Sequence, residues 1–512
     1  MLEGRTLWEL IDKRVEATPD ALLAVDEDMR TMTFIELATE AERAAAGLAN
    51  YGVSAGSVVS WQLPTWLESL VLVAALSRLG AVQNPILPIY REREVGFVTK
   101  QADASLLVVP STFAGFDFEA MARAMAAEKS GMKVLVADRA LPQGDPASLP
   151  AIGDSGAVAD DEIRWLFYTS GTTADPKGAR HTDASIAAVG KGMGERLALI
   201  EADRAALVFP FTHIGGITWL FSSLQFGSSL ILMESFHPQR TPEVLARENV
   251  TVAGSGTPFH MAYLAYQKGE AAPVFPNVRC FPGGGAPKPP QLVYDMRELF
   301  DAPVLSGYGL TEAPILTMAS VDDDDDELAV SEGKAMPGVE LRLVRLDGGV
   351  AGPGEEGEVR AKAPQMMKGY LDSSLNADAF DEDGYFRTGD LGRLDEAGNL
   401  IITGRLKDII IRKGENVSAK EVEDMLFTHP QVADVAVIGV PDADRGEMVV
   451  AVVQTAEGAE PISKGEMVDF LKNEGLMIQK LPERLEHLEV IPRNPSGKIL
   501  KHELRARYSP AD

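Results

Sequence analysis

The chain has 512 residues, with a hydrophobic fraction of 45% and a charged fraction of 24%, as is typical of a globular protein. Its formal net charge of -28 disfavours a broad nucleic-acid surface, although it leaves room for an anionic nucleotide ligand. Because Cys280 is the only cysteine, the chain can form neither an internal disulfide nor a cysteine zinc cluster.

The N-terminal residues and the apolar runs indicate where the protein works. Residues 1–6 lack the apolar core of a secretion signal. The longest apolar runs, such as Leu70–Leu76, are too short to span a bilayer. We therefore expect a cytoplasmic protein with no transmembrane segment and no nucleic-acid partner.

Apolar spacing predicts alternating helices and strands over the first three quarters of the chain. Residues 6–17 have helical spacing, and Thr33 with Glu36 forms a capping-box pattern before a helix that ends near Gly52. A further helix is expected at 66–79. The expected strands are 57–63, 106–110, 163–168, 206–209, 230–233, 251–253, 279–281 and 303–305. This alternation predicts an α/β fold in which a large N-terminal domain of several subdomains contains sheets rich in parallel strands.

The character of the sequence changes after about residue 339. Ser418 and Ser463 are expected to cap two helices, and 435–440 and 449–454 are expected to be strands. These elements predict a compact α+β unit of about 100 residues, a size that folds alone. We place the domain boundary so that the large domain covers 1–406 and the small C-terminal domain covers 407–512. The acidic block 322–326 is expected to be a solvated loop, because like charges repel.

The most informative segment is Tyr168-Thr-Ser-Gly-Thr-Thr-Ala-Asp-Pro-Lys-Gly-Ala179, which follows an apolar strand. Small hydroxyl groups and free N–H groups beside a glycine can bind phosphate oxygens, so this segment suits a loop that holds a polyphosphate. It is not the common P-loop, because no Gly-Lys-Ser/Thr stands at the required spacing. A polar surface loop is the simpler alternative.

Six further segments carry chemical groups at the ends of expected strands or in turns. Tyr308 can stack on a purine, Glu312 is a hard oxygen ligand for Mg²⁺, and Asp390 can accept two hydrogen bonds from a ribose diol. His213 precedes a glycine pair and Trp219, which suits the wall of an apolar pocket. The remaining segments are 283–287, 404–408 and 494–498. Simpler interpretations exist: the glycine-rich segment 283–287 as a turn, His213 as a structural histidine and the lysine of 494–498 as a surface lysine.

Together these segments, in this order, resemble the adenylate-forming superfamily of acyl-CoA synthetases, luciferases and peptide-synthetase adenylation domains. The resemblance covers essentially the whole chain and departs at Ala174, where the family usually has glycine. It implies catalytic roles for Lys498, Thr169, Glu312 and His213, and a Mg²⁺ site at Thr169 and Glu312. The residues that it assigns to the nucleotide are Thr169, Ser170, Gly171, Thr172, Thr173, Lys177, Gly285, Ala286, Pro287, Gly307, Tyr308, Gly309, Thr311, Asp390, Arg405 and Lys498.

The resemblance also implies where the other substrates bind and how the domains move. The acid pocket is expected at His213, Gly216, Trp219, Gly283, Gly284 and Tyr308. The small domain is expected to swing about Lys407. This movement would remove Lys498 and bring the loop containing Lys413 and Gly414 to the coenzyme A tunnel.

The implied reaction is the AMP-forming ligation of a carboxylic acid to coenzyme A through an acyl-AMP, with ATP and coenzyme A as co-substrates and Mg²⁺ as cofactor. A fatty, alicyclic or aromatic acid is expected, because glycine and apolar residues dominate the pocket segments and no aspartate stands there to hold an amino group. Three alternatives remain: a fatty acyl-AMP ligase that loads a carrier protein, a luciferase-like oxygenase, and a nucleotide-binding regulator without turnover. A homodimer is also compatible with the sequence.

Overall fold

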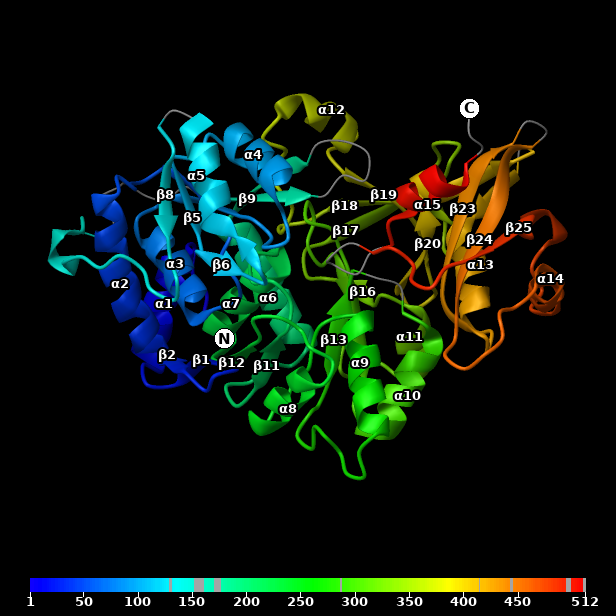
Figure 1. The fold of residues 1–512 in the computed structure, drawn as a ribbon, viewed down its shortest axis with the longest axis horizontal. Helices are drawn as coiled ribbons and strands as arrows, with labels where there is room; N and C mark the ends of the chain where they lie inside the picture. The colour runs from blue at the N-terminus through cyan, green and yellow to red at the C-terminus, as the bar shows by residue number, and fades with distance from the viewer. Residues whose placement is uncertain are drawn as a thin grey trace.

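The structure of the chain is a computed structural model, shown as a ribbon in Figure 1. The residues that it describes are 1–128, 131–151, 161–169, 176–285, 288–413, 415–442, 445–493 and 499–509.

Two sheets rich in parallel strands dominate the first half of the chain. The first has the order β11-β12-β1-β2, with β1 (Leu22–Asp26), β2 (Thr31–Thr33), β11 (Arg204–Leu207) and β12 (Ser229–Leu232). The second has the order β10-β9-β4-β3-β5-β8, with β3 (Val58–Trp61), β4 (Val82–Pro85), β5 (Leu106–Val109), β8 (Lys133–Val136), β9 (Ile163–Thr169) and β10 (Lys177–Thr182). Strands β6 (Thr112–Phe113) and β7 (Phe116–Asp117) form a separate short hairpin. The expected parallel-rich sheets are confirmed here by the pairing of β12 with β1 and β11, and of β3 with β4 and β5.

Helices cover these sheets, and their ends follow the capping rules. The capping box expected at Thr33 is present: its hydroxyl accepts from Glu36 N at 3.3 Å, and its own N–H donates to Glu36 Oε2 at 2.7 Å. Helix α1 contacts α2, α3 and α7. Helix α3 is buried on nearly all sides, with α1, α2, β1 and β4 as neighbours, and its sequence is correspondingly apolar. The helices of this half are α1 (Leu7–Ala17), α2 (Phe34–Asn50), α3 (Leu67–Arg78), α4 (Glu92–Gln101), α5 (Phe118–Glu128), α6 (Asp183–Arg196), α7 (Ile214–Phe226), α8 (Arg240–Arg247) and α9 (Thr257–Lys268), with a 3-10 turn η1 (Pro146–Ser148).

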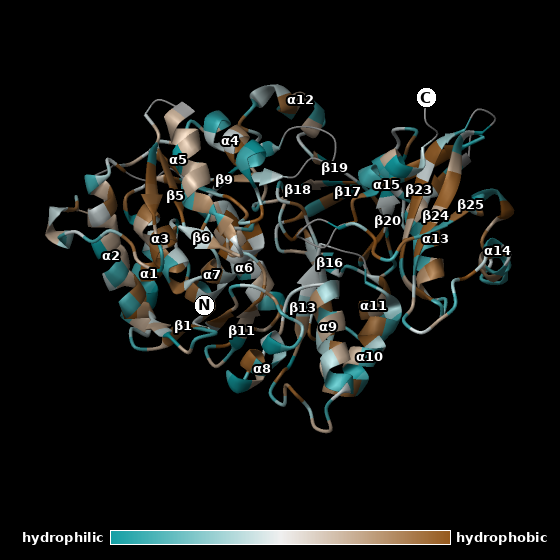
Figure 2. Cartoon of the chain, in the orientation of Figure 1, coloured by the Kyte–Doolittle hydropathy of each residue, from teal (hydrophilic) through white to brown (hydrophobic). Residues whose placement is uncertain are grey.

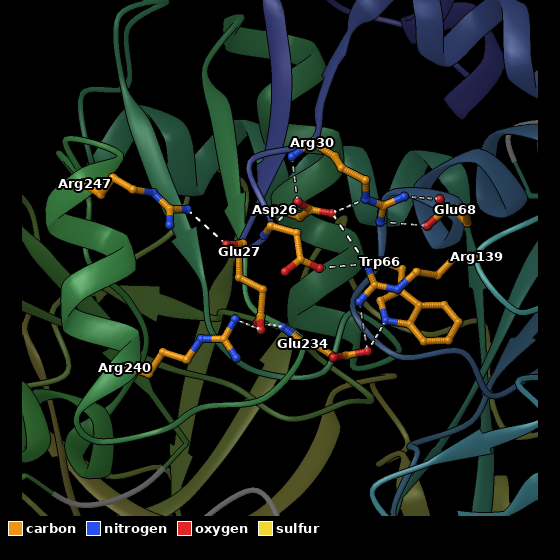
Figure 3. A network of polar contacts seen from close by, with 10 residues as sticks. Asp26, Glu27, Arg30, Trp66, Glu68, Arg139, Glu234, Arg240 and Arg247 are labelled. Atoms are coloured by element: carbon orange, nitrogen blue, oxygen red, sulfur yellow. Dashed lines mark hydrogen bonds and ion pairs between the residues drawn. The ribbon is translucent and has the colours of Figure 1, made fainter.

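A network of charged side chains joins the two parallel-rich sheets at the ends of their strands (Figure 3). Asp26, the last residue of β1, is 4% exposed and accepts from Arg30 Nε at 2.7 Å. Arg30 also donates to Glu68 on α3 at 2.6 Å. Beyond β8, Arg139 lies 3.5 Å from Glu234, which follows β12. The network therefore ties the ends of β1 and β12 to helix α3, which connects β3 and β4 of the other sheet, and to the segment after its strand β8.

The middle of the chain adds a mixed sheet and an antiparallel sheet. The mixed sheet has the order β13-β14-β15-β16, with β13 (Phe281–Gly284), β14 (Val304–Tyr308), β15 (Thr317–Met318) and β16 (Lys334–Ala335), and only its β13–β14 pair is parallel. The antiparallel sheet has the order β17-β18-β19-β20, with β17 (Glu340–Val344), β18 (Gly357–Lys362), β19 (Phe386–Leu394) and β20 (Leu400–Arg405). The helices of this part are α10 (Pro290–Phe300), α11 (Asp325–Val330) and α12 (Asn376–Ala379), with a 3-10 turn η2 (Ser373–Leu375).

The C-terminal part forms a lobe of its own in Figure 1, drawn in orange and red. Its sheet has the order β22-β21-β24-β23, with β25 beside β24, and Figure 2 shows β23 and β24 as hydrophobic. Two clusters of buried side chains, all from Ile410 onward, form its core. This separate core supports the boundary between Leu406 and Lys407, which stays a prediction. The elements are η3 (Leu406–Asp408), β21 (Ile409–Arg412), β22 (Glu415–Ser418), α13 (Ala419–Phe427), β23 (Val432–Asp442), β24 (Gly446–Thr455), α14 (Lys464–Asn473), η4 (Ile478–Lys480), β25 (Arg484–His487) and α15 (Lys501–Tyr508).

Two local expectations fail. The acidic block 322–326 is not a loop throughout, because α11 begins inside it at Asp325, where Arg297 pairs with the Asp325 carboxylate at 2.9 Å. The segment 251–253 forms only an isolated bridge at Val252 rather than a strand. Among the helices in the described ranges, none combines the length and the apolar character that a bilayer crossing requires.

Candidate active site

The end of β14 brings together three residues that the sequence assigned to a nucleotide. Tyr308, the last residue of β14, donates its hydroxyl hydrogen to Asp390 Oδ2 at 2.8 Å. Asp390 on β19 faces Arg405 on β20 across the strand pair, and Arg405 Nε lies 2.8 Å from its Oδ1. Burial, together with the Asp390 charge, raises the pKa of Tyr308 well above its ordinary value, so the hydroxyl stays protonated. The group offers an aromatic ring, a buried carboxylate and a cation in one place.

The glycines before this group serve close packing between neighbouring segments. Strands β13 and β14 are parallel, with Gly284 opposite Gly307. A Cβ on Gly284 would overlap the Gly307 carbonyl, and one on Gly283 would lie 2.7 Å from Gly256 N. These two positions, which the sequence assigned to the acid pocket, therefore border backbone on at least one side. The carboxyl ends of the two strands meet at this edge, where ligands bind in open α/β sheets.

The loop after β14 holds Thr311 and Glu312, and two buried side chains fix it. His181 on β10 donates from Nε2 to the Thr311 carbonyl at 2.8 Å. Burial lowers the pKa of His181 to about 4, so the ring is neutral at pH 7. The hydroxyl of Tyr370 donates to Glu312 Oε1 at 2.7 Å, and the pKa of Tyr370 is raised by burial and by the Glu312 charge. Glu312 is itself only 8% exposed.

Strands β9 and β10 place the ends of the expected phosphate loop beside each other. Thr169 ends β9, Lys177 begins β10, and the two are opposite each other in the antiparallel register. Lys177 Nζ lies 5.4 Å from the centre of the Tyr370 ring. The loop between the strands, with Ser170, Gly171, Thr172 and Thr173, lies outside the described residues, as do Ala286, Pro287, Gly414 and Lys498.

A small recess with an accessible volume of about 30 Å³ lies beside His213. His213 caps the N-terminus of α7, where its Nδ1 accepts from Gly215 N at 3.1 Å. Among the described residues, the hydroxyl of Thr212 is buried without a hydrogen-bond partner. The residues that line the recess are Pro85, Ile86, Leu87, Tyr90, Val98, Phe167, Tyr168, Thr212, His213, Ile214 and Thr311. The structure therefore joins His213 to Thr311 and to the start of the phosphate loop.

Four further residues with expected roles do not line this recess. Trp219 is 3% exposed within the large hydrophobic core, and it is not among the side chains that line this recess. Gly216 is packed so that a Cβ would lie 2.7 Å from the backbone of Phe211. In the C-terminal part, Lys407 is exposed in η3, and Lys413 adopts a left-handed conformation with φ 50°. The roles assigned to these four residues stay predictions.

Two family models together match most of the chain. A model of the AMP-binding enzyme family matches residues 11–371, and a model of the AMP-binding enzyme C-terminal domain matches residues 421–498. The chain belongs to the AMP-binding enzyme family. The resemblance seen in the motifs is thereby confirmed, and so is the class of fold.

Three relatives of this AMP-binding enzyme illustrate the range of the family. The medium-chain fatty-acid–CoA ligase of Escherichia coli (strain K12) is 31% identical, over 98% of this chain and 90% of the relative. The salicyl-AMP ligase/salicyl-S-ArCP synthetase of Mycobacterium tuberculosis (strain ATCC 25618 / H37Rv) is also 31% identical, over 97% and 90%. The solved structure of o-succinylbenzoate coenzyme A synthetase from Bacillus subtilis, in complex with ATP and magnesium ion, has a TM-score of 0.84 and 29% identity, over 97% and 98% of the two chains.

Sequence reasoning missed several residues of this AMP-binding enzyme site. His181 and Tyr370 hold the Thr311–Glu312 segment, and neither stood out because a lone histidine or tyrosine is common in a core. Tyr90 and Val98 on the wall of the recess come from α4 and the loop before it. The only sequence signal for them is that Asn84 and Pro85 end a buried strand, which places the following loop at the sheet edge.

Proposed function

We propose that this AMP-binding enzyme is an AMP-forming carboxylic acid–coenzyme A ligase. In the first half-reaction a carboxylate oxygen attacks the α-phosphorus of ATP, and the bond to the β-phosphate breaks to release pyrophosphate. In the second, the thiolate of coenzyme A attacks the acyl carbon and AMP leaves. Attachment of AMP is needed because a free carboxylate is a poor electrophile, and no covalent enzyme intermediate is required.

The observation that carries the proposal is the contact of Asp390 with both Tyr308 and Arg405. In this arrangement Tyr308 would stack on the adenine while Asp390 and Arg405 receive the ribose. Lys177 and the loop that contains Ser170, Gly171, Thr172 and Thr173 would hold the phosphates. The remaining nucleotide contacts would come from backbone groups at Gly285, Ala286, Pro287, Gly307 and Gly309 and from the Thr311 hydroxyl.

The donor groups present fit Mg²⁺ bound together with ATP. Among the described residues there is no cluster of three or more histidine, cysteine, aspartate or glutamate side chains that could hold a metal alone. Mg²⁺ usually binds through one or two carboxylates plus substrate phosphates, which is what the Glu312 carboxylate and the Thr169 hydroxyl can offer. When bound, the ion would neutralise charge on the phosphate oxygens. Lys498 would supply a second positive charge in the same half-reaction.

The recess beside His213 supports an apolar acid. Most of its lining is aliphatic or aromatic, and its polar groups are few. In a neutral His213 whose Nδ1 accepts from Gly215, the proton is on Nε2, which can donate to a carboxylate. A fatty, alicyclic or aromatic acid meets these conditions, with Trp219, Gly283 and Gly284 as further proposed neighbours. Gly216 was expected beside them, but its packing against the Phe211 backbone competes with that role. The small domain would then turn about Lys407 to present Lys413 and Gly414 to coenzyme A.

The test is a panel of carboxylic acids assayed for pyrophosphate release and for coenzyme A-dependent AMP formation. A ligase gives both products with at least one acid, and AMP formation then depends on coenzyme A. Acid-dependent pyrophosphate release with transfer only to a carrier-protein thiol would identify the carrier-loading alternative, which the salicyl-S-ArCP synthetase relative favours. Nucleotide binding without either product would refute the proposal in favour of a non-catalytic regulator.

A further inference from the structure

The structure places Tyr370 between two residues of the proposed ATP site. Its hydroxyl donates to Glu312 Oε1 at 2.7 Å, and its ring lies 5.4 Å from Lys177 Nζ. The side chain is 4% exposed, so water competes little for either contact. Neither partner is near Tyr370 in the sequence, since Glu312 precedes it by 58 positions.

The backbone around Tyr370 is held from both sides. Gly369 has φ 92°, a conformation that favours glycine, and a Cβ there would press on the side-chain amide of Asn376. That amide accepts from Tyr370 N at 2.8 Å. On the other side, Leu371 N donates to the Gly178 carbonyl at 2.8 Å, and Tyr370 bridges to Ala179 on β10. The ring is therefore aimed by β10, the strand that begins at Lys177.

We propose that Tyr370 is a positioning residue that fixes the Glu312 carboxylate for the divalent cation bound with ATP. This inference rests on the proposed function and deepens it. A carboxylate that accepts a strong hydrogen bond on Oε1 cannot turn freely, so Oε2 presents its lone pairs in one direction. Because the same ring contacts Lys177, the carboxylate and the lysine at the end of the phosphate loop keep a fixed relation to each other.

Groups that orient a metal ligand affect metal affinity strongly, and their loss typically costs about 10-fold to 100-fold. Tyr370→Phe removes only the hydroxyl and keeps the ring beside Lys177. We expect it to raise the dissociation constant for the divalent cation by about tenfold. The affinity for ATP without metal should change little, because the ring remains.

The chain offers a matched control in Tyr385. Its hydroxyl donates to Glu340 Oε2 at 3.0 Å, and Arg342 lies 3.9 Å from the centre of its ring. Tyr385→Phe therefore removes the same kind of tyrosine–glutamate hydrogen bond beside a cation, in a different pair of residues. A purely structural effect of losing such a bond would be similar in both variants.

The experiment measures Mn²⁺ binding by electron paramagnetic resonance in the presence of a non-hydrolysable ATP analogue. The wild type, Tyr370→Phe, Tyr385→Phe and Glu312→Gln are compared, with melting temperatures for each. The Mg²⁺ dependence of pyrophosphate release provides a second readout. Asn376→Ala removes the side chain that holds the Tyr370 backbone and does not alter Glu312. It should weaken Mn²⁺ binding by a smaller factor than Tyr370→Phe, and it replaces that variant in the comparison if Tyr370→Phe does not fold.

Weaker Mn²⁺ binding in Tyr370→Phe, with Tyr385→Phe like the wild type, supports the inference. Unchanged Mn²⁺ affinity in Tyr370→Phe and Asn376→Ala, while Glu312→Gln binds weakly, overturns it and leaves the proposed function standing. Equal binding by Glu312→Gln and the wild type overturns the metal role of Glu312 and the inference with it. An absence of acid-dependent pyrophosphate release in the wild type would instead count against the proposed function.

Discussion

Gly216→Ala separates two explanations of the glycine pair that follows His213. If Gly216 borders the acid, a methyl group there should change which acid is preferred. If it serves packing, the same methyl group should destabilise the fold. The structure favours packing, because an added Cβ would lie 2.7 Å from both Cα and O of Phe211.

The expected magnitude follows from what surrounds Phe211. The residue is 1% exposed, its N–H donates to Thr65 Oγ1 at 3.1 Å, and its ring lies 6.0 Å from that of Trp61. The clash is therefore with backbone that cannot move alone. Overpacking of this kind costs about 1–3 kcal/mol, and alanine recovers about 1 kcal/mol through helix propensity. We therefore expect Gly216→Ala to lower the free energy of unfolding by up to about 2 kcal/mol.

The assay is denaturant unfolding followed by tryptophan fluorescence, combined with the acid panel on the same preparations. Gly215→Ala is the matched control, because its Cβ would lie 3.2 Å from His213 Nδ1 and 3.4 Å from the Phe209 ring, contacts that small side-chain shifts relieve. It should unfold like the wild type or be more stable by up to about 1 kcal/mol, since the same helix propensity acts without a backbone clash. A Gly216→Ala variant with unchanged unfolding and an altered acid preference would refute the packing argument and return Gly216 to the pocket wall.

Three further predictions concern catalysis, nucleotide binding and pH. Lys498→Ala should reduce pyrophosphate release by about 10²–10³-fold, while much of the conversion of supplied acyl-AMP to acyl-CoA remains. Single-turnover assays of the two half-reactions measure this difference, and an equal loss in both would contradict the domain movement. Asp390→Asn removes the negative charge paired with Arg405 and should raise the KM for ATP about tenfold, and an unchanged KM would exclude a nucleotide role. Burial and the neighbouring Glu42 raise the pKa of Asp12 to about 6. Protonation of Asp12 therefore makes its full contribution to the free energy of unfolding below about pH 4, and this contribution is lost as the pH rises through 6. Asp12→Asn should therefore stabilise the protein by about 1 kcal/mol at pH 7.5 and leave it unchanged at pH 4, as melting curves at both pH values can check.

Local rules predicted the helix starts well. The hydroxyl caps expected at Thr33, Ser418 and Ser463 are all present, because a cap needs only a side chain and the backbone three residues away. The acidic block 322–326 follows the same local rule, which the emphasis on charge repulsion obscured. Asp324 caps α11 by accepting from Glu327 N at 2.9 Å, and Asp325 and Asp326 stand in the first helical turn. Arg297, from the preceding helix, adds an ion pair with Asp325 that the block itself does not encode.

That Tyr308 and Glu312 lie at or just after a strand end could be predicted from the sequence, while the nucleotide role of these two residues, Asp390 and Arg405 stays a prediction. Tyr308 ends β14 and Glu312 follows it, so the parallel pairing with β13 alone brings them to the sheet edge. Asp390 and Arg405 are cross-strand partners, a relation that a hairpin creates. What the sequence could not supply was the contact between these two sheets, where a shared cluster of buried side chains forms and Tyr308 donates to Asp390, 82 positions away.

The supporting residues were missed for a related physical reason. His181 and Tyr370 are valuable because they are buried and point at Thr311 and Glu312, and burial is decided by the packing of the whole domain. A neutral histidine and a protonated tyrosine add donors to the site without adding charge. The protein has a formal net charge of -28 and is proposed to bind a polyanion. Because His181 and Tyr370 are neutral donors, Lys177 is not needed to hold the Glu312 segment and can serve the phosphates in the proposed site. Buried neutral side chains therefore orient the Thr311–Glu312 segment, and a positive charge remains for the ligand in the proposed adenylation.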